Sequence, residues 1–250
     1  MIAIDTPFLM ASLAALLVGL SKGGLPTIGM LGVPILSLVM PPMQAVVILL
    51  PIYVISDLVS VWLYRKHFSA INLKILVPAG IFGIFIGWLT ASYTSVAATK
   101  LLIGGIGVGF CLNTWLRKAP AQAHGPDLPR GIFWGALAGF TSFISHAGAP
   151  PFQVYVLPQR LPKMVFAGTA TLLFAVLNAV KILPYQLLQP YSMDDLYKAS
   201  VLIPAALLGT VAGAYLTKKI ADVWFYRCLQ IGLFLISLKL IADAASAWGL

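Results

Sequence analysis

The apolar stretch that starts at Phe8 stops after thirteen residues at the segment Ser21–Pro26 (SKGGLP) and resumes as Thr27–Met40. A comparable break occurs in the second half of the chain, at His146–Pro151 (HAGAPP). Irregular backbone at membrane depth is tolerated only against protein or a water-filled cavity, because its freed N–H and C=O groups need partners. Two broken helices in matching halves therefore indicate the binding site of a membrane transporter.

Composition supports the membrane assignment. Of the 250 residues, 60% are hydrophobic and 9% are charged, with a mean hydropathy of +0.95, whereas soluble domains are about one quarter charged. The start of the chain, Met1–Asp5, is acidic and no small-residue cleavage site follows, so we expect no removable signal peptide. The Lys and Arg residues are scattered singly, which argues against a nucleic-acid partner. The sequence predicts an all-α polytopic membrane protein embedded in a lipid bilayer.

Apolar runs long enough to cross about 30 Å of hydrocarbon as helices predict full membrane crossings. There are six of them: Met43–Tyr64, Leu73–Ser92, Ala97–Leu116, Lys163–Tyr185, Leu196–Leu216 and Trp224–Ala245. Two shorter runs, Phe8–Leu20 and Gly131–Ile144, reach about 20 Å as helices and lead into the breaks. We expect each of them to be the first limb of a re-entrant helical hairpin. Aromatic residues near span ends, Tyr64 and Tyr185 among them, fit interfacial belts.

The two halves of the chain align with each other. Gly19 matches Gly139 at an offset of 120, and Asp57 falls opposite Asn178 one residue later. This internal similarity predicts a first membrane repeat at 1–119, a cytoplasmic linker at 120–130 and a second membrane repeat at 131–250.

Positive charge decides whether the repeats are inverted or parallel. If each broken segment enters and leaves on one side, every repeat is a hairpin plus three crossings and the second is inverted. The basic loops then share one face. The other face carries Asp5, Asp194, Asp195 and Asp243, with Lys100 and Lys198 near span ends. Parallel repeats would place Arg65–Lys74 opposite Lys218 and Lys219. The positive-inside rule favours inversion, with both termini periplasmic. The basic residues of the shared face are Arg65, Lys66, Lys74, Arg117, Lys118, Arg130, Arg160, Lys163, Lys218 and Lys219.

The residues at the breaks favour an anion. A new helical limb is expected after each break, and a helix N-terminus carries unpaired N–H groups and about half a positive charge. Glycines let an oxyanion approach the backbone, prolines suit the first helical turn, and a lysine and hydroxyls add donors. The predicted substrate-binding residues are Ser21, Lys22, Gly23, Gly24, Pro26, Thr27, Ser145, His146, Gly148, Pro150 and Asn178.

Three ionisable residues are candidates for coupling to a proton or sodium ion. Asp57 lies about 10 Å inside its span, where a carboxylate is costly, and it serves either in coupling or as a structural partner of Lys22. His146 titrates in the physiological range, but a neutral histidine bonded to a carbonyl is an equal alternative. Lys181 lies one turn beyond Asn178 and belongs either to the site or to the membrane surface.

Other chemistries find no support in the sequence. Cys111 and Cys228 lie in apolar runs and are interpreted as packing residues, so we expect neither a disulfide nor a metal. No nucleotide-binding, metalloprotease or nucleophile motif occurs at a recognisable spacing. We therefore expect no enzymatic activity and no cofactor, in a protein that is a monomer or a homodimer.

Several segments of the sequence resemble the motifs of a known family. The segments Gly19–Pro26 and His146–Pro151, followed by Gly168-Thr169 and Asn178–Lys181, are similar to the sulfite exporter TauE/SafE family of bacterial membrane transporters. The resemblance covers nearly the whole chain, although Ala149 stands where relatives often have glycine. It implies transport of sulfite, sulfoacetate or a related sulfonate across the bacterial inner membrane.

The functional prediction is a secondary transporter or facilitator that moves a small organic or sulfur-containing anion by alternating access. The alternatives are a cation- or proton-conducting channel centred on Asp57 and a proton-coupled carboxylate transporter.

Overall fold

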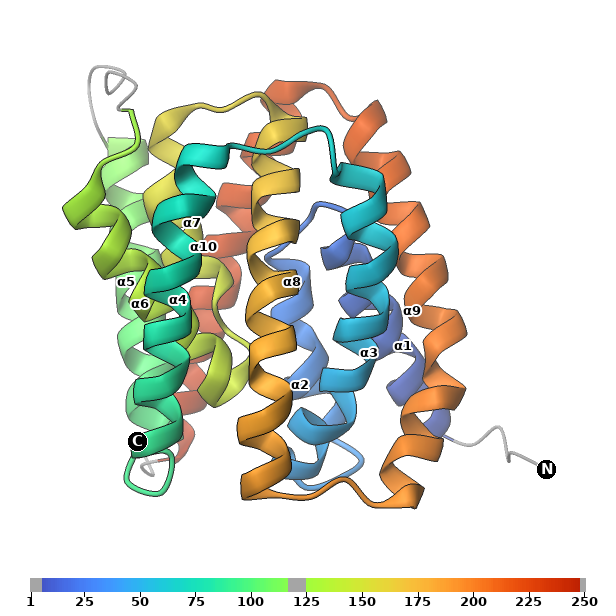
Figure 1. The fold of residues 1–250 in the computed structure, drawn as a ribbon. Helices are drawn as coiled ribbons and strands as arrows, with labels where there is room; N and C mark the ends of the chain where they lie inside the picture. The colour runs from blue at the N-terminus through green and yellow to red at the C-terminus, as the bar shows by residue number, and fades with distance from the viewer. Residues whose placement is uncertain (1–5, 117–124, 248–250) are drawn as a thin grey trace. The chain divides into compact units, whose positions relative to one another are not determined.

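A computed structural model describes residues 6–116 and 125–247, and all regular structure within them is helical. Asp5, Arg117, Lys118 and positions 120–124 of the expected linker lie outside the described residues. The helices, shown in Figure 1, are α1 (Thr6–Lys22), η1 (Ile28–Leu31), α2 (Gly32–Leu36), α3 (Pro42–Tyr64), α4 (Ala70–Thr90), α5 (Val96–Leu116), α6 (Leu128–Ser145), α7 (Ala149–Val156), η2 (Leu157–Gln159), α8 (Lys163–Leu188), α9 (Met193–Lys219) and α10 (Asp222–Ala247).

Among the described residues, six helices are long and apolar enough to cross a membrane: α3, α4, α5, α8, α9 and α10. They coincide with the six apolar runs of the sequence, so the expectation of an all-helical chain with six candidate spans is confirmed. Side-chain caps define several helix starts. Ser69 and Asp127 accept hydrogen bonds from the backbone N–H groups of Asn72 and Arg130, and Ser192 opens α9 with a capping box.

The chain forms two compact units, each of which draws on both halves of the sequence. The first unit comprises residues 1–68 and 167–220, and the second comprises residues 69–166 and 221–250. The first unit thus contains α1 to α3, most of α8 and all of α9. The second contains α4 to α7 and α10. The expected repeats follow each other along the chain, whereas each of these units combines segments from both halves. The repeats therefore stay a prediction.

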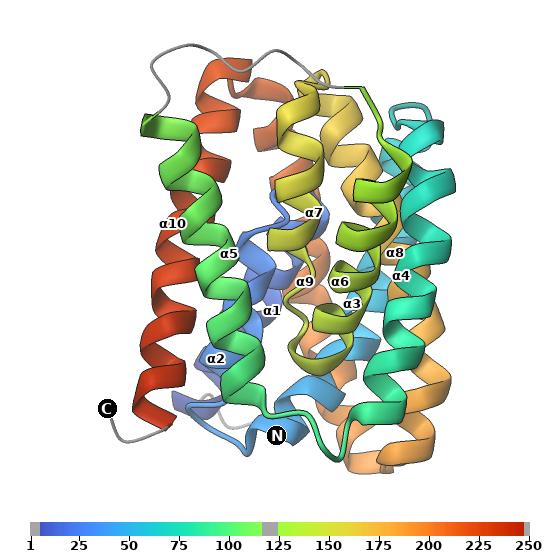
Figure 2. The ribbon, with the colours of Figure 1, turned by 90° about the vertical axis from the view of Figure 1, so that its left-hand side faces the viewer.

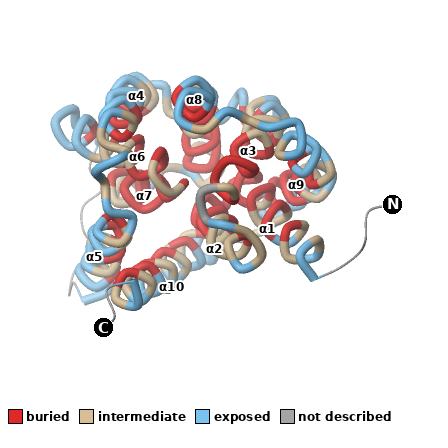
Figure 3. The backbone as a smooth tube through the Cα atoms, turned by 90° about the horizontal axis from the view of Figure 1, so that it is seen from below, coloured by how far each residue is buried: buried red, intermediate tan, exposed pale blue. Residues whose placement is uncertain are grey.

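In the first unit, α1 packs closely against α9. A Cβ atom on Gly19 would lie 1.9 Å from the carbonyl oxygen of Ala206, and one on Gly209 would lie 2.2 Å from that of Leu16. Small residues thus bring the two backbones into contact, which is how membrane helices associate without a hydrophobic driving force. Figure 3 shows buried residues along the inner faces of α1 and α9, while the outward side chain of Leu208 is exposed.

In the second unit, α4 packs against α6 in the same manner, and α5 lies beside α10 (Figure 2). A Cβ atom on Gly139 would lie 1.9 Å from the carbonyl oxygen of Gly80, and one on Gly83 would lie 1.9 Å from that of Ala136. Gly139 aligns with Gly19 and Gly83 aligns with Gly209 when the sequence halves are superposed. Each unit therefore contains the same pair of backbone approaches, made by residues at matching positions.

Contacts within each unit place the charged loops. In the first unit, Gln44 at the start of α3 donates to Asp195 at the start of α9 over 3.2 Å. At the other ends of these helices, Tyr64 and Thr217 both bond the carbonyl of Gly23. Because α3 and α9 run in the same direction, the adjoining basic residues share one end of the unit and the acidic residues share the other. The basic residues are Arg65, Lys66, Lys218 and Lys219, and the acidic ones are Asp194 and Asp195.

The second unit has an equivalent basic end. The side-chain amides of Asn72 and Gln159 exchange two hydrogen bonds of 2.8 and 3.1 Å. Lys74, one turn into α4, and Arg160, after η2, therefore lie at the same end of this unit. Lys163 is 3.4 Å from Asp222 at the start of α10 in the same unit.

The chain doubles back at both breaks. After α1, η1 and α2 return along it, so that a Cβ on Gly29 would touch Ser21 and one on Gly32 would touch Val18. After α6, α7 returns until Tyr155 exchanges hydrogen bonds with the backbone of Asp127. The first return differs from expectation, because the segment Thr27–Met40 is not one helix. It is a single 3-10 turn followed by five helical residues, since Pro34 removes a backbone donor.

We expect the close helix approaches to set stability. Gly139→Ala places a methyl group against the Gly80 carbonyl and should lower stability by about 1–3 kcal/mol, the usual cost of overpacking. Gly105→Ala is the matched control, because a Cβ at Gly105 meets nothing within 4 Å. Thermal unfolding of the purified variants in detergent measures the difference. Equal melting temperatures for the two variants would show that this contact does not constrain the fold.

Candidate functional site

Buried charge is concentrated in the first unit. Among the described residues, the lysine and aspartate side chains that are buried are Lys22, Asp57 and Lys181, with exposures of 5%, 4% and 0%. They come from α1, α3 and α8. An isolated charge is expensive to remove from water, so charges inside a membrane protein are candidates for function by default.

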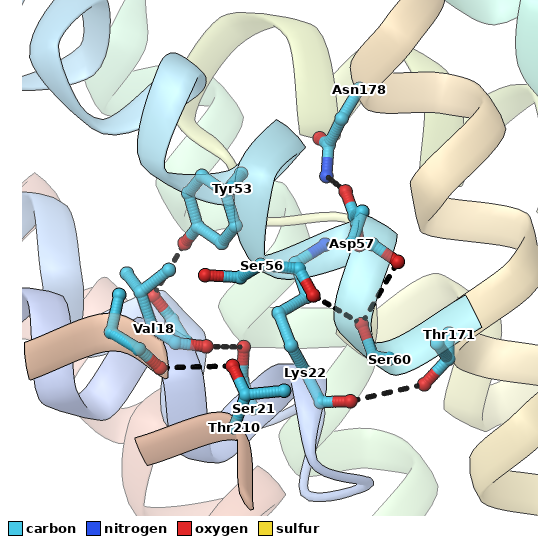
Figure 4. A network of polar contacts seen from close by, with 12 residues as sticks. Val18, Ser21, Lys22, Tyr53, Ser56, Asp57, Ser60, Thr171, Asn178 and Thr210 are labelled. Carbon is cyan, nitrogen blue, oxygen red and sulfur yellow. Dashed lines mark hydrogen bonds and ion pairs between the residues drawn. The ribbon is translucent and has the colours of Figure 1, made fainter. Parts of the chain in front are cut away.

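Lys22 and Asp57 form an ion pair. The Nζ atom of Lys22 lies 2.7 Å from Oδ1 of Asp57 and 4.9 Å from the centre of the Tyr53 ring. The other carboxylate oxygen, Oδ2, accepts a 2.7 Å hydrogen bond from Nδ2 of Asn178. Figure 4 shows Asp57 between Lys22 and Asn178. The alternative in which Asp57 is a partner of Lys22 is therefore confirmed as a contact, and the residues matched across the repeats, Asp57 and Asn178, touch directly.

Lys181 is the third charge of the group. Its side chain is fully buried, so the interpretation that it reaches the membrane surface is wrong. The turn of α8 that carries Asn178 also carries Lys181, whose charge interacts with those of Asp57 and Lys22. We call Lys22, Asp57, Asn178 and Lys181 the lysine–aspartate cluster.

Hydroxyl groups from three helices hold the end of α1 in place. The Lys22 carbonyl accepts a 3.3 Å hydrogen bond from Thr171 of α8. The Gly23 carbonyl accepts bonds of 2.5 Å from Tyr64 of α3 and 3.0 Å from Thr217 of α9. The last carbonyls of a helix lack intrahelical partners, so these hydroxyls satisfy the backbone where the helix stops. Lys22 itself stands in the last turn, where a positive charge is favoured by the helix dipole.

The two glycines of the break are required by its geometry. Gly24 has a φ angle of 112°, and a Cβ there would lie 2.6 Å from the Tyr64 hydroxyl. A Cβ on Gly23 would lie 2.5 Å from the backbone nitrogen of Ala214. The N–H groups of Gly23 and Gly24 donate to the carbonyls of Gly19 and Ser21. In this conformation they complete the end of α1.

The remaining predicted residues of the first break surround the same point. The Ser21 hydroxyl donates to the Val18 carbonyl over 2.7 Å, and Thr27 is buried just before η1. Pro26 lies in the turn and not in the first turn of a helix, contrary to expectation. Ser56, next to Asp57, is fully buried, and its Oγ atom has no hydrogen-bond partner among the described residues.

The second break lies in the second unit and is described separately. α6 ends at Ser145, and His146 adopts a left-handed conformation with φ of 54°. Gly148 then precedes α7, whose first turn contains Pro150, as the sequence predicts. Thr141 donates to the Ala147 carbonyl over 3.0 Å. The expectation that both breaks contribute to one binding site stays a prediction.

Sequence reasoning missed the hydroxyls that hold the first break. Tyr64 was assigned to an interfacial belt, but it is 1% exposed and bonds Gly23, and Tyr185 is buried as well. The Thr171 hydroxyl donates to the Lys22 carbonyl, on another helix. Tyr53 carried no signal, although its hydroxyl donates to the Gly29 carbonyl and its ring faces Lys22. These partners are far apart in sequence, so no local pattern marks them.

The described residues contain no group of three or more His, Cys or Asp side chains that would suit a metal ion. The site that the first unit does contain is an ion pair with a second lysine, held beside an interrupted helix.

Comparison with known proteins identifies a family for this chain. No curated protein and no solved structure gives a significant match. The family model described as "Sulfite exporter TauE/SafE" matches residues 11–240, which includes both breaks and every residue of the lysine–aspartate cluster. The resemblance seen in the motifs is thereby confirmed, and the chain belongs to the sulfite exporter TauE/SafE family.

Proposed function

We propose that this membrane protein is a secondary transporter or facilitator that moves a small sulfur-containing anion across the bacterial inner membrane by alternating access. Sulfite is the substrate that the family description names, and sulfoacetate and related sulfonates are the further candidates that the resemblance of the motifs implies. The observation that carries the proposal is that the lysine–aspartate cluster holds two buried lysines and one buried aspartate.

The charge balance of the cluster favours an anion. When all three groups ionise, Lys22 and Lys181 outweigh Asp57 by one positive charge. A buried ion is costly unless it is paired, with a penalty of several kcal/mol in real proteins. A bound anion would pair with the lysines, and two ammonium groups suit the several oxygens of a sulfite or sulfonate group. A resident cation would raise the positive charge further, which argues against a cation channel centred on Asp57.

Hydroxyls near the break provide further donors. Ser56 has a buried Oγ without a partner among the described residues. Ser21 and Thr27 are buried at the two ends of the first break, and the Ser21 hydroxyl would have to turn from the Val18 carbonyl to reach a substrate. We propose that Ser21, Lys22, Thr27, Asn178 and Lys181 bind substrate in the first unit. For the second unit, the proposal keeps Ser145, His146, Gly148 and Pro150 at the start of α7.

We further propose that the two halves are inverted repeats with periplasmic termini. Parallel repeats would put Arg65 and Lys66 opposite Lys218 and Lys219, yet contacts within the first unit place all of them at one end. Within the second unit, the Asn72–Gln159 pair brings Lys74 and Arg160 to one end. These groupings support the inverted arrangement that the positive-inside rule favours.

The topology is tested by cysteine labelling. In a background in which Cys111 and Cys228 are replaced by alanine, Lys66→Cys and Arg160→Cys should react with an impermeant maleimide in inside-out vesicles and not in intact spheroplasts. Asp194→Cys, at the opposite end of α9, should show the reverse pattern and serves as the control. Labelling of Lys66→Cys and Arg160→Cys from opposite sides would contradict the inverted model.

Lys181 tests the anion site. Lys181→Met removes one of the two buried ammonium groups, and a hydrogen bond to a charged group contributes about 1.5–3 kcal/mol. We expect uptake of sulfite or sulfoacetate into proteoliposomes to fall about tenfold or more. Lys198→Met is the matched control, because Lys198 is exposed and pairs with Asp194 on α9. Unchanged anion uptake in Lys181→Met, or current that follows a cation gradient, would contradict the proposed function.

The ion pair tests the charge balance through stability. Asp57→Leu leaves two buried ammonium groups without their carboxylate and should cost about 3–5 kcal/mol of unfolding free energy. Lys22→Met should cost less, because Asp57 keeps Asn178 and the nearby charge of Lys181. Unfolding of the variants in detergent measures which of them loses more unfolding free energy. Asp243→Leu is the control, because Asp243 is partly exposed. A larger loss in Lys22→Met than in Asp57→Leu would refute the assigned excess of positive charge.

A further inference from the structure

We propose that Asp57 is a built-in competitor of the substrate for Lys22, and that it takes up one proton each time the substrate anion displaces it. This inference rests on the proposed function and deepens it by naming the coupling ion and the group that carries it. The protein would then be a proton–anion symporter with its proton site at the Asp57–Asn178 pair.

The geometry gives each carboxylate oxygen of Asp57 a different partner. Oδ1 meets the ammonium group of Lys22, and Oδ2 meets the amide of Asn178, both at 2.7 Å. Lys22 is the predicted substrate ligand of the break. When the site is empty, its charge is neutralised by Asp57. A substrate anion has to replace Oδ1 at Lys22. Asp57 would then remain buried next to a second anion, and a proton on its carboxyl group removes that repulsion.

Asn178 suits both protonation states of Asp57. Its NH₂ group donates to the carboxylate in the observed state. Its carbonyl oxygen can accept a hydrogen bond from a protonated carboxyl group after the amide turns over, because an amide carries donors and acceptor on one plane. A lysine in its place would serve only the ionised state. The aligned residue of the other half thus keeps Asp57 hydrogen-bonded throughout the exchange.

The titratable groups around Asp57 come from three helices. They are Lys22 on α1, Lys181 on α8 and Tyr53 on α3. η1 and α2 contain no titratable residue, and none of the titratable residues of α9 is buried. In the observed state the ammonium group of Lys22 pairs with the Asp57 carboxylate, and in the proposed cycle the carboxyl group takes up its proton when an anion replaces that pairing. Proton uptake and anion binding are reciprocal, as linkage requires.

A proton fits this place better than sodium does. The groups that contact the Asp57 carboxylate are an ammonium and an amide N–H, both of which are donors. Hard metal cations bind several oxygen ligands and are repelled by ammonium groups. A proton needs only the carboxylate and the amide oxygen that the pair can present.

The experiment uses purified protein in proteoliposomes with a pH-sensitive dye inside and the membrane potential clamped. Sulfoacetate and isethionate are the probes, because both stay ionised near neutral pH and carry no proton themselves. Wild-type protein should acidify the lumen as the anion enters. An inward proton gradient of one pH unit should drive the anion above equilibrium, up to about tenfold for one proton per anion.

Variants assign the proton to Asp57. Asp57→Asn should lose accumulation against a gradient, and Asp57→Glu, which keeps a titratable group, should retain it. Asp243→Asn, a carboxylate paired with Lys100 in the second unit, should accumulate the anion as the wild type does. Anion entry without acidification in the wild type, or accumulation by Asp57→Asn, would overturn the inference and leave the proposed function standing. The absence of anion flux in the wild type would instead overturn the proposed function.

Discussion

A helix that stops inside an apolar environment leaves carbonyl groups that must be satisfied by other parts of the chain. In the first unit this requirement falls on the carbonyls of Lys22 and Gly23, which receive hydroxyls from α8, α3 and α9. These bonds fix where α1 ends and therefore where the ammonium group of Lys22 lies. Two of these helices also carry the other residues of the cluster, Asp57 on α3 and Asn178 and Lys181 on α8. The helices that satisfy the backbone of the break therefore also position its charges.

Close backbone packing provides the frame for this arrangement. Gly19 and Gly209 let α1 and α9 touch, and Gly139 and Gly83 let α6 and α4 touch in the second unit. Because a side chain at these positions would meet a carbonyl oxygen, the spacing of the helices is set by glycine. The broken segments are held between long helices that are paired by the same kind of contact in both units. Glycines at matching positions of the aligned halves thus make the same kind of close approach in both units, with partners taken from different halves of the chain.

The buried charges of the site depend on one another. A single buried lysine beside an interrupted helix would be costly, and Asp57 offsets that cost in the absence of a substrate. The second buried lysine, Lys181, is the group that we propose meets the substrate anion together with Lys22. In the proposed cycle, this internal carboxylate is exchanged for the substrate anion at Lys22, so the pair that stabilises the empty site is also the pair that the substrate opens.

The sequence by itself determined the helical membrane class, the candidate spans, the two breaks and the family. These properties follow from hydropathy, glycine and proline placement and motif spacing, which are local. It also singled out Lys22, Asp57 and Asn178, because charged or amide groups in apolar spans stand out without any structure. The tertiary structure decided which of these residues touch, that Lys181 is buried, that the return after the first break is a short 3-10 turn, and that Tyr64, Thr171 and Thr217 hold the helix end. Contacts between residues distant in the chain depend on how helices pack, and no local pattern of residues encodes that packing.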